Sequence, residues 1–323
     1  MNSINSDSFS AFKYSKHKKN LAERFIEALV RYKYVYLMLT PGMVCLLLFR
    51  YAPMYGILLA FKNYRPKNGF FGSPWIGLQQ FIKFLEDPYS FILFKNTFLL
   101  GIFGLLWGFP MTIIFALLLN EINMMRVKKY LQTFSYLPYF VSTIIIIGIF
   151  KEFMDLNTGI INDLIKFFGG EPVYFFGKRE WFRPIYIISS IWQSVGFGSI
   201  IYMAAISGID LELYESAVID GSSRFKNLLF ITIPSILPTI TVMLILAVGG
   251  ILDNNFTRIL LIYNAANMET ADVLQTYIYR VGLLGGSYSF GAAVGLMNSI
   301  VSFFFLFVTN NITRRIGDGN SLW

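Results

Sequence analysis

Six apolar stretches, each of about 20 residues or more, constrain this chain more than any other feature of its sequence. An α-helix of about 20 mostly apolar residues crosses the hydrocarbon core of a membrane, which is about 30 Å thick. Hydrophobic residues make up 55% of the 323 positions and charged residues only 14%, which leaves too little charge for the surface of a soluble protein. We therefore expect an all-α polytopic membrane protein with six transmembrane helices, at Tyr34 to Phe61, Phe91 to Leu119, Phe134 to Phe153, Pro184 to Ile206, Leu228 to Leu252 and Phe290 to Thr309.

Lysine and arginine predict how these helices are oriented, because loops rich in them stay on the cytoplasmic side. Most of the signal lies in the polar segment 1–33, with further basic residues after the second stretch and at the C-terminus. We expect both termini and the segment 210–227 in the cytoplasm, and the segments 62–90, 154–183 and 253–289 outside. The basic residues that decide this are Lys13, Lys16, Lys18, Lys19, Arg24, Arg31, Lys33, Arg126, Lys128, Lys129, Arg314 and Arg315.

This predicted topology divides the chain into three parts. Residues 1–33 form a cytoplasmic tail, residues 34–310 a transmembrane domain, and residues 311–323 a cytoplasmic C-terminal tail. Within the first tail, apolar residues recur at helical spacing, which predicts an amphipathic helix on the inner membrane surface. The apolar face of that helix is Leu21, Phe25, Ala28, Leu29 and Tyr32.

The composition excludes most enzyme chemistry. One cysteine (Cys45) and one histidine (His17) cannot form a disulfide framework, a Cys/His zinc site or a Ser-His-Asp triad. No acidic residue or histidine lies near the centre of an apolar stretch, which argues against a proton-driven carrier and against a membrane enzyme. Arg50 is the one charge well inside a stretch, and it either extends to the outer headgroups or contacts a substrate. We expect no metal site and no cofactor.

Nucleotides and nucleic acids are not expected as ligands. The chain lacks a Gly-x-x-x-x-Gly-Lys-Ser/Thr loop, so it has no phosphate-binding loop of that kind. Its net charge of +8 is explained by the orientation of the membrane helices, and the sequence contains no basic run with interleaved aromatic residues.

The segment 210–234 is polar where its neighbours are apolar, and it predicts a helix, a turn and a second helix on the cytoplasmic side. The first helix has an apolar stripe, Gly221 ends it, and Phe225 belongs to the second helix. Glu215 and Asp220 could cap these helices or pair with basic groups of a partner. The stripe consists of Leu211, Tyr214, Ala217 and Val218.

The spacing within this segment resembles the cytoplasmic EAA loop of binding-protein-dependent ABC importer permeases. That loop reads Glu-x-Ala, three residues, Gly, nine residues and Ile-x-x-Pro. Here Ser216 replaces the usual alanine and Ile233 the usual leucine before proline. The matching positions are Glu215, Ala217, Gly221, Ile231 and Pro234. The alternative is an ordinary amphipathic loop helix.

This resemblance implies a type I ABC importer permease fold and a set of partners. In that family the loop is a coupling helix seated in a cleft of the ATP-binding subunit. One permease provides half of a pathway, so the resemblance implies a second homologous permease, two ATP-binding subunits that hold ATP and Mg²⁺, and an extracytoplasmic solute-binding protein. The residues implied in coupling are Glu215, Ser216, Ala217, Asp220, Gly221, Ser222 and Phe225.

Softer motifs indicate the branch of the family. They resemble the oligosaccharide-importing branch that includes lipoprotein-associated polysaccharide permeases and the larger membrane subunit of maltose-type importers. A basic outer face could attract an acidic, uronate-containing oligosaccharide. Its residues are Arg50, Lys62, Arg65, Lys67, Arg179 and Arg183. The motifs are Tyr36–Leu39, Pro41-Gly42, Tyr51–Gly56, Ala60-Phe61, Lys95–Thr97, Ser135–Pro138, Asp272–Gly282, Tyr288-Ser289 and Ser321–Trp323.

Sugars are held by aromatic faces and by hydrogen bonds from amides and hydroxyls, and both types occur in the fourth stretch and after the fifth. The resemblance implies that these segments line the sugar cavity. The candidate residues are Ser190, Trp192, Gln193, Ser194, Phe197, Asp253, Asn254 and Asn255. Alternatively, polar groups here join helices, with Gly196 and Gly198 allowing close approach.

Two alternatives for the whole protein remain open from the sequence. One is an ABC importer permease for a non-sugar solute, because the EAA loop is common to these importers. The other is a channel or scaffold subunit without ATPase coupling. The outer segments 62–88 and 253–289 would meet a solute-binding protein or serve as solvated connectors.

Overall fold

The computed structural model describes residues 30–316 of the chain, with the side chains of residues 30–314. The described part is helical throughout, apart from an isolated bridge between Lys62 and Trp75 and the connecting turns. The predicted amphipathic helix of the first tail lies outside the described residues except for Tyr32, as do His17 and Ser321–Trp323. The chain divides into two compact units, residues 1–56 and 57–323.

The described part of the first unit is a single apolar helix in which no residue from 30 to 55 is buried. Its described part consists of α2 (Lys33–Leu46), a π-helical turn η1 (Leu47–Tyr51) and the start of η2 (Ala52–Phe61). The whole helix, Lys33–Phe61, matches the first predicted span. Every residue from 30 to 55 is exposed within the unit, and Arg50 lies exposed in η1. A helix that is apolar all round requires lipid or another chain as its surroundings.

The second predicted span is one long helix interrupted by a π-helical turn. After η3 (Pro66–Asn68), α3 (Gly69–Gly72) and α4 (Gln79–Glu86), it runs as α5 (Pro88–Phe103), η4 (Gly104–Gly108) and α6 (Phe109–Asn120). Asp87 caps its first turn, because its side chain accepts a hydrogen bond from the Tyr89 backbone N–H at 2.9 Å. The span Pro88–Asn120 confirms the prediction and extends it by a turn at the start.

The third predicted span, Phe134 to Phe153, is wrong as a single helix. The structure has α7 (Met125–Phe140) and α8 (Thr143–Phe153), which meet at 101°. Val141 is extended at the break, and the Ser142 side chain caps α8 by accepting from the Ile144 N–H at 3.3 Å. The apolar run continues across this break, so hydropathy does not reveal it. Helix α7 also begins earlier than expected and includes Arg126, Lys128 and Lys129, which had been predicted to lie in a loop.

Helix α10 (Arg179–Ser207) is the fourth span, and other helices of this unit pack around it. It follows α9 (Ile160–Phe167) and η5 (Phe175–Gly177). A side chain at Gly196 would overlap the Ser135 carbonyl oxygen of α7, and one at Gly198 would press on Thr112 of α6. The predicted close approach at both glycines is therefore confirmed. Buried Phe182, Ile185 and Tyr186 contribute to the core on the N-terminal half of α10.

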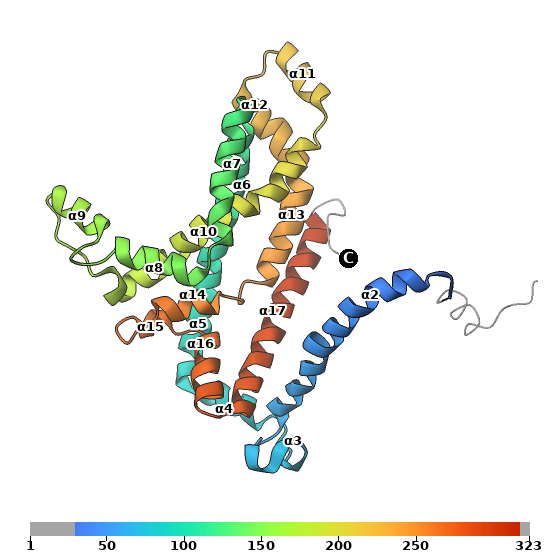
Figure 1. Cartoon of the computed structure of the whole chain (residues 1–323), viewed down its shortest axis with the longest axis vertical. Helices are drawn as coiled ribbons and strands as arrows, with labels where there is room; N and C mark the ends of the chain where they lie inside the picture. Colours follow the sequence, from blue (N-terminus) through green and yellow to red (C-terminus); the bar gives the residue numbers. More distant parts are fainter. Residues whose placement is uncertain (1–29, 317–323) are drawn as a thin grey trace, which may run out of the picture. The chain divides into compact units, whose positions relative to one another are not determined.

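The remaining helices complete the bundle of this unit (Figure 1). Helix α11 (Leu211–Ile219) and α12 (Arg224–Asn227) lie at one end, and η6 (Leu228–Thr232) and α13 (Ile233–Gly249) form the fifth span, which ends a turn before the predicted Leu252. The expected outer loop 253–289 contains short helices instead: α14 (Phe256–Ile262), α15 (Met268–Ala271), α16 (Leu274–Tyr277) and η7 (Ile278–Leu284).

Helix α17 (Tyr288–Ile316) is the sixth span and packs along α13 (Figure 1). It continues past the predicted end at Thr309, so the expected boundary between residues 310 and 311 falls inside a helix. In the described residues, five helices are long and apolar enough to cross a membrane, and six if the bent α7–α8 pair counts as one span.

Candidate functional site

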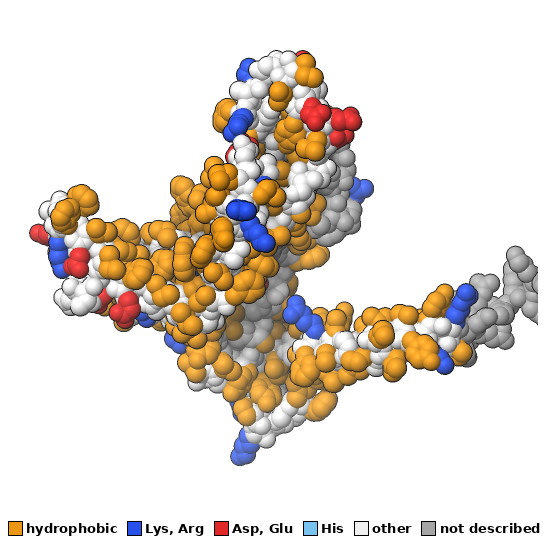
Figure 2. All heavy atoms as spheres, turned by 45° about the horizontal axis from the view of Figure 1, so that its top comes forward, with side chains coloured by type: hydrophobic (Ala, Val, Ile, Leu, Met, Phe, Trp, Pro, Cys, Tyr) orange, Lys and Arg blue, Asp and Glu red, His pale blue; other side chains and the backbone are white. Residues whose placement is uncertain are grey.

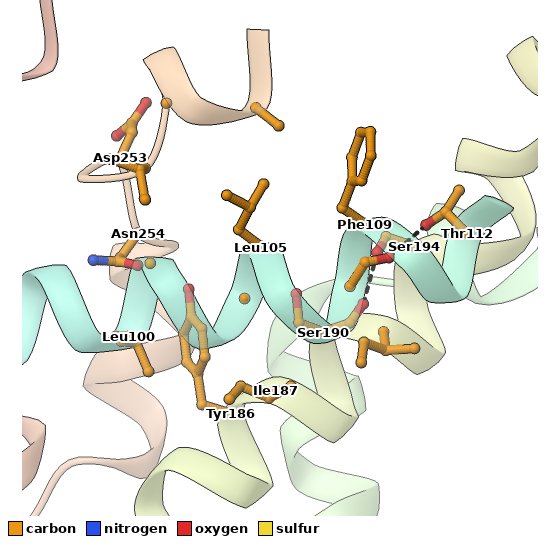
Figure 3. A pocket seen from close by; sticks show the side chains of 17 residues that line it. Leu100, Leu105, Phe109, Thr112, Tyr186, Ile187, Ser190, Ser194, Asp253 and Asn254 are labelled. Carbon is orange, nitrogen blue, oxygen red and sulfur yellow. Dashed lines mark hydrogen bonds between the residues drawn. The ribbon is translucent and has the colours of Figure 1, made fainter. Parts of the chain in front are cut away.

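A cavity of about 330 Å³ lies between the second span, α10 and the end of the fifth span (Figure 3). Glycines form much of the wall on the second span, and the absence of side chains there leaves the space open. The opposite wall comes from one face of α10 and from the non-helical residues after α13. The lining residues are Leu100, Gly101, Gly104, Leu105, Gly108, Phe109, Thr112, Tyr186, Ile187, Ser190, Ile191, Ser194, Ala247, Gly250, Ile251, Asp253 and Asn254.

Four of the predicted sugar-site residues line this cavity: Ser190, Ser194, Asp253 and Asn254. The Ser194 hydroxyl donates to the Ser190 carbonyl at 2.8 Å, which leaves its oxygen as an acceptor (Figure 3). The Asn254 side chain is buried and donates to the Thr97 carbonyl at 3.2 Å. Asp253 is exposed, and its Oδ1 accepts from the Gln275 amide at 3.2 Å.

The structure does not bring Trp192, Gln193, Phe197 and Asn255 to this cavity. Trp192 lines a separate apolar groove of about 780 Å³, together with Trp107 and Arg183. The ring of Phe197 stacks on Tyr139, with 4.1 Å between the ring centres. An α-helix turns about 100° per residue, so Trp192 projects from the side of α10 opposite Ser190 and Ser194, whereas Phe197 lies on their side of the helix but further along it.

Gln193 and Asn255 have structural contacts instead. The Gln193 amide donates to the Val141 carbonyl at 2.9 Å, at the break between α7 and α8, and its Oε1 accepts from Arg258. Asn255 caps α14, because its side chain accepts from the Arg258 backbone N–H at 3.0 Å. For Gln193 the alternative of joining helices describes the observed contacts, whereas the Asn255 side chain caps its own helix.

The sequence analysis missed Tyr186 and Thr112, which add polar groups to the cavity. Tyr186 lies one turn before Ser190 on the same face of α10, so helical spacing could have identified it. Its hydroxyl accepts a hydrogen bond from the Asn255 backbone N–H at 3.0 Å. Thr112 donates to the Gly108 carbonyl at 2.9 Å (Figure 3). Hydroxyl, phenol and amide groups therefore face a space between membrane spans.

The predicted coupling segment forms the helix, turn and helix that its sequence indicates. Gly221 has φ +73°, a left-handed conformation that favours glycine. The Gly221 N–H donates to the Val218 carbonyl at 3.0 Å and the Ser222 N–H to the Ala217 carbonyl at 2.9 Å. This pattern is a Schellman motif, which ends α11 at a fixed angle.

Capping in this segment comes from residues other than those predicted. The Asp210 carboxylate accepts from the Glu212 N–H at 3.0 Å and caps α11, and the Ser223 hydroxyl accepts from the Lys226 N–H at 3.4 Å and caps α12. Glu215 and Asp220 are exposed and have no capping role in the structure. Their carboxylates remain available to a partner.

The coupling segment presents a mixed apolar and charged surface. Of the predicted apolar stripe, Tyr214 and Ala217 are half-buried, whereas Leu211 and Val218 are exposed. The Ile219 side chain is 86% exposed, which marks a surface made for contact rather than for water. Figure 2 shows hydrophobic and acidic side chains exposed together at this end of the molecule.

One hydrogen bond ties the coupling helix to the fifth span. The Tyr214 hydroxyl lies 2.9 Å from the Thr232 hydroxyl, and Thr232 is buried in the π-helical turn η6. The Thr232 hydroxyl also donates to the Asn227 carbonyl at 3.4 Å. Sequence analysis placed Tyr214 in an apolar stripe and did not predict this bond.

Residues 124–318 match the family described as binding-protein-dependent transport system inner membrane component. The chain belongs to this family. The permease is 41% identical to the polygalacturonan/rhamnogalacturonan transport system permease protein YteP of Bacillus subtilis (strain 168), over 93% of its own length and 94% of the relative's. It is 42% identical to Protein LplB of the same organism, over 90% and 92% of the two chains.

A solved structure supports the same family assignment. The permease superposes with a TM-score of 0.84 on a chain in the crystal structure of a bacterial ABC transporter involved in the import of the acidic polysaccharide alginate. The two chains are 40% identical, and the match covers 92% of the permease and 100% of that chain. The predicted family, the all-α importer permease fold and the importer function are confirmed. The alternative of a channel or scaffold subunit without ATPase coupling is not confirmed.

Proposed function

We propose that this permease translocates uronate-containing oligosaccharides through the cavity between its second, fourth and fifth spans. The observation that carries this proposal is a cavity of about 330 Å³ in which hydroxyl, phenol and amide groups line a membrane-spanning bundle. The names of two relatives support the substrate class, because one transports polygalacturonan and rhamnogalacturonan and the other imports alginate.

The cavity groups suit a sugar for chemical reasons. The hydroxyl groups of Ser194 and Thr112 already donate to backbone carbonyls, so their oxygens can accept hydrogen bonds from sugar hydroxyls. Tyr186, which is 6% exposed, adds a phenol to the same wall. Asn254 adds an amide at the same wall. Weak, multiple contacts of this kind allow a solute to enter and to leave.

Coupling to ATP hydrolysis would pass through the 210–234 segment. Two ATP-binding subunits, which carry ATP and Mg²⁺, would receive Glu215, Ser216, Ala217, Asp220, Gly221, Ser222 and Phe225 in their clefts. Phe225 is 70% exposed, which suits an anchor for a partner. Closure of the ATPases would push α11, and the Tyr214–Thr232 bond would carry that motion into the fifth span.

The complete importer would contain further subunits. A second homologous permease would form the other half of the pathway, and an extracytoplasmic solute-binding protein would deliver the sugar. Both termini would face the cytoplasm, in the cell membrane of a bacterium. The chain itself would hold no metal or cofactor and would bind lipid but no nucleic acid.

ATPase activity of the complete complex tests this function. The permease would be purified with its second permease, ATPases and solute-binding protein, reconstituted in lipid, and supplied with neutral and uronate-containing oligosaccharides. Stimulation by uronate oligosaccharides that depends on the binding protein would support the proposal. Stimulation by a non-sugar solute alone would overturn the sugar and leave the family assignment intact.

A further inference from the structure

Arg258 is a buried cation that forms no ion pair with any residue that the structure describes. It is 2% exposed and lies in α14, directly behind the α10 wall of the cavity. Its Nη1 donates to the Ser189 hydroxyl at 2.8 Å, and its Nη2 donates to Oε1 of the Gln193 side-chain amide. The guanidinium carbon lies 5.9 Å from the centre of the Tyr186 ring, and the buried Nε has no hydrogen-bond partner. All these partners are neutral, so they orient the positive charge without neutralising it.

Two other arginines, Arg280 and Arg179, are paired with carboxylates. The Nη2 of Arg280 lies 2.5 Å from Oδ2 of the buried Asp272, and the Nη1 of Arg179 lies 2.5 Å from Oε2 of Glu269. Arg183, which bonds Asn96 at 3.1 Å, lines the apolar groove instead of the cavity. Burial of an unpaired ion is costly, and perturbed charges of this kind concentrate at functional sites.

The position of Arg258 places its charge beside the sugar. Ser189 and Gln193, which it bonds, each precede by one residue a serine that lines the cavity, Ser190 and Ser194. Tyr186 contacts Arg258 and also lines the cavity, so one aromatic ring separates the guanidinium from the space. A charge in such a dry position is weakly screened and acts across several ångströms.

The opposite charge in the cavity wall is differently placed. Asp253 is exposed and bonds Gln275, and it also lines a second, more apolar pocket with Phe256 and Tyr279. Water screens an exposed carboxylate far more than it screens a buried guanidinium. After screening by water, the charge of Arg258 therefore contributes more than the charge of Asp253 to the electrostatic potential at the α10 wall, and that contribution is positive.

We propose that Arg258 is a specificity-determining residue that selects anionic, uronate-containing oligosaccharides by providing a fixed positive potential to the cavity. The inference rests on the proposed function and deepens it. A carboxylate on the sugar provides the negative charge that no described residue places beside Arg258. A neutral sugar of the same shape gains no such interaction.

The test compares trigalacturonate with its methyl ester, because esterification removes the charge and keeps the sugar rings. Uptake kcat/KM is measured for both in proteoliposomes that contain the complete importer. Because every variant works with the same solute-binding protein, that protein's own preference cancels when variants are compared with the unmodified permease. Arg258→Gln removes the charge and keeps a hydrogen-bonding side chain. Gln193→Glu neutralises Arg258 by an adjacent carboxylate and changes almost no volume.

Both variants should lower the acid-to-ester ratio of kcat/KM by about tenfold, with the ester changed less than twofold. Arg258→Lys should keep most of the ratio because it keeps the charge, and Arg126→Gln, at an exposed arginine of α7 outside the basic outer face, should leave it unchanged. If the importer does not assemble with Arg258→Gln, Gln193→Glu still tests the inference. Its carboxylate forms an ion pair with Arg258 and so compensates the buried charge.

Two results would overturn the inference while the proposed function stands: an unchanged ratio in either assembled variant, or an equal loss for acid and ester, which would mark Arg258 as a packing residue. A different result identifies failure of the proposed function itself. In that case the unmodified importer would take up neither sugar.

Discussion

At the scale of single residues, Gly221 and Gly196 need to be glycine for two different reasons. Gly221 has φ +73°, so its constraint lies in the backbone, and open space surrounds the position where a side chain would begin. Gly196 has ordinary helical dihedrals, and its constraint is the Ser135 carbonyl oxygen pressed against it. The first glycine shapes a surface for a partner, and the second allows two helices to touch.

Gly221→Val should disrupt coupling without removing the permease from the membrane. A β-branched residue in the left-handed region costs at least about 1–2 kcal/mol, so α11 would end at a different angle. Uptake should fall at least about tenfold. Gly221→Asn should retain more activity because asparagine tolerates this conformation, and Gly208→Ala, where space and dihedrals permit a side chain, serves as the control. Equal uptake by Gly221→Val and Gly221→Asn would contradict this account.

Gly196→Ala should destabilise the contact between α7 and α10. The added methyl overlaps a backbone oxygen that cannot move without moving α7, and such overpacking costs about 1–3 kcal/mol. A lower midpoint of thermal unfolding in detergent is expected. Gly148→Ala is the matched control, since its side chain would meet nothing within 4 Å. A midpoint lowered equally in both variants would show that the overlap does not matter.

At the scale of elements, α11 is fixed at both ends and is also bonded to the fifth span. The Schellman motif at Gly221 fixes one end of α11, the Asp210 cap fixes the other, and the Tyr214–Thr232 bond joins it to η6. A π-helical turn at the point of attachment is notable, because such turns are rare and occur frequently at functional sites.

Tyr214→Phe should weaken the transmission of motion while leaving the exposed face of α11 intact. The loss of one hydrogen bond to a buried hydroxyl, worth about 1 kcal/mol, should reduce sugar-stimulated uptake by about fivefold. Copurification of the ATP-binding subunits should not change, because Tyr214 is half-buried and faces the fifth span. Tyr130→Phe, at a tyrosine that is 67% exposed, controls for the loss of a phenol. Unaltered uptake in Tyr214→Phe would rule out this role.

Elements also show where sequence prediction succeeds and fails. Hydropathy locates most spans because crossing a membrane is a local requirement of about 20 residues. It misses the 101° bend at Val141 because both sides of the break are apolar. Sequence position places Ser190, Trp192 and Gln193 at a similar depth in the membrane. Their side chains leave α10 in different directions, however, and have different surroundings. Tertiary contacts such as those of Arg258 depend on chain segments far apart and leave no local pattern.

At the scale of the whole molecule, the cavity depends on three segments that approach one another, with glycines forming part of the wall on the second span. Gly104→Leu should fill it, since nothing lies within 4 Å of the new Cβ and the cavity measures about 330 Å³. Membrane levels and basal ATPase activity should be retained, and sugar-stimulated ATPase activity should fall at least about tenfold. Gly148→Leu, on the open side of α8, is the control for added bulk. Full stimulation in Gly104→Leu would place the pathway elsewhere.

The glycine wall also limits how transporters of this kind can diversify. A side chain at Gly101 would overlap the Ile251 carbonyl oxygen, so that position tolerates no alternative that keeps the two segments together. Ser190, Ser194 and Asn254, on the other walls, can vary without such a clash in the backbone. Gly101 is therefore expected to stay glycine, whereas a new sugar preference would arise by substitutions on α10, after α13 or at other lining positions of the second span such as Thr112.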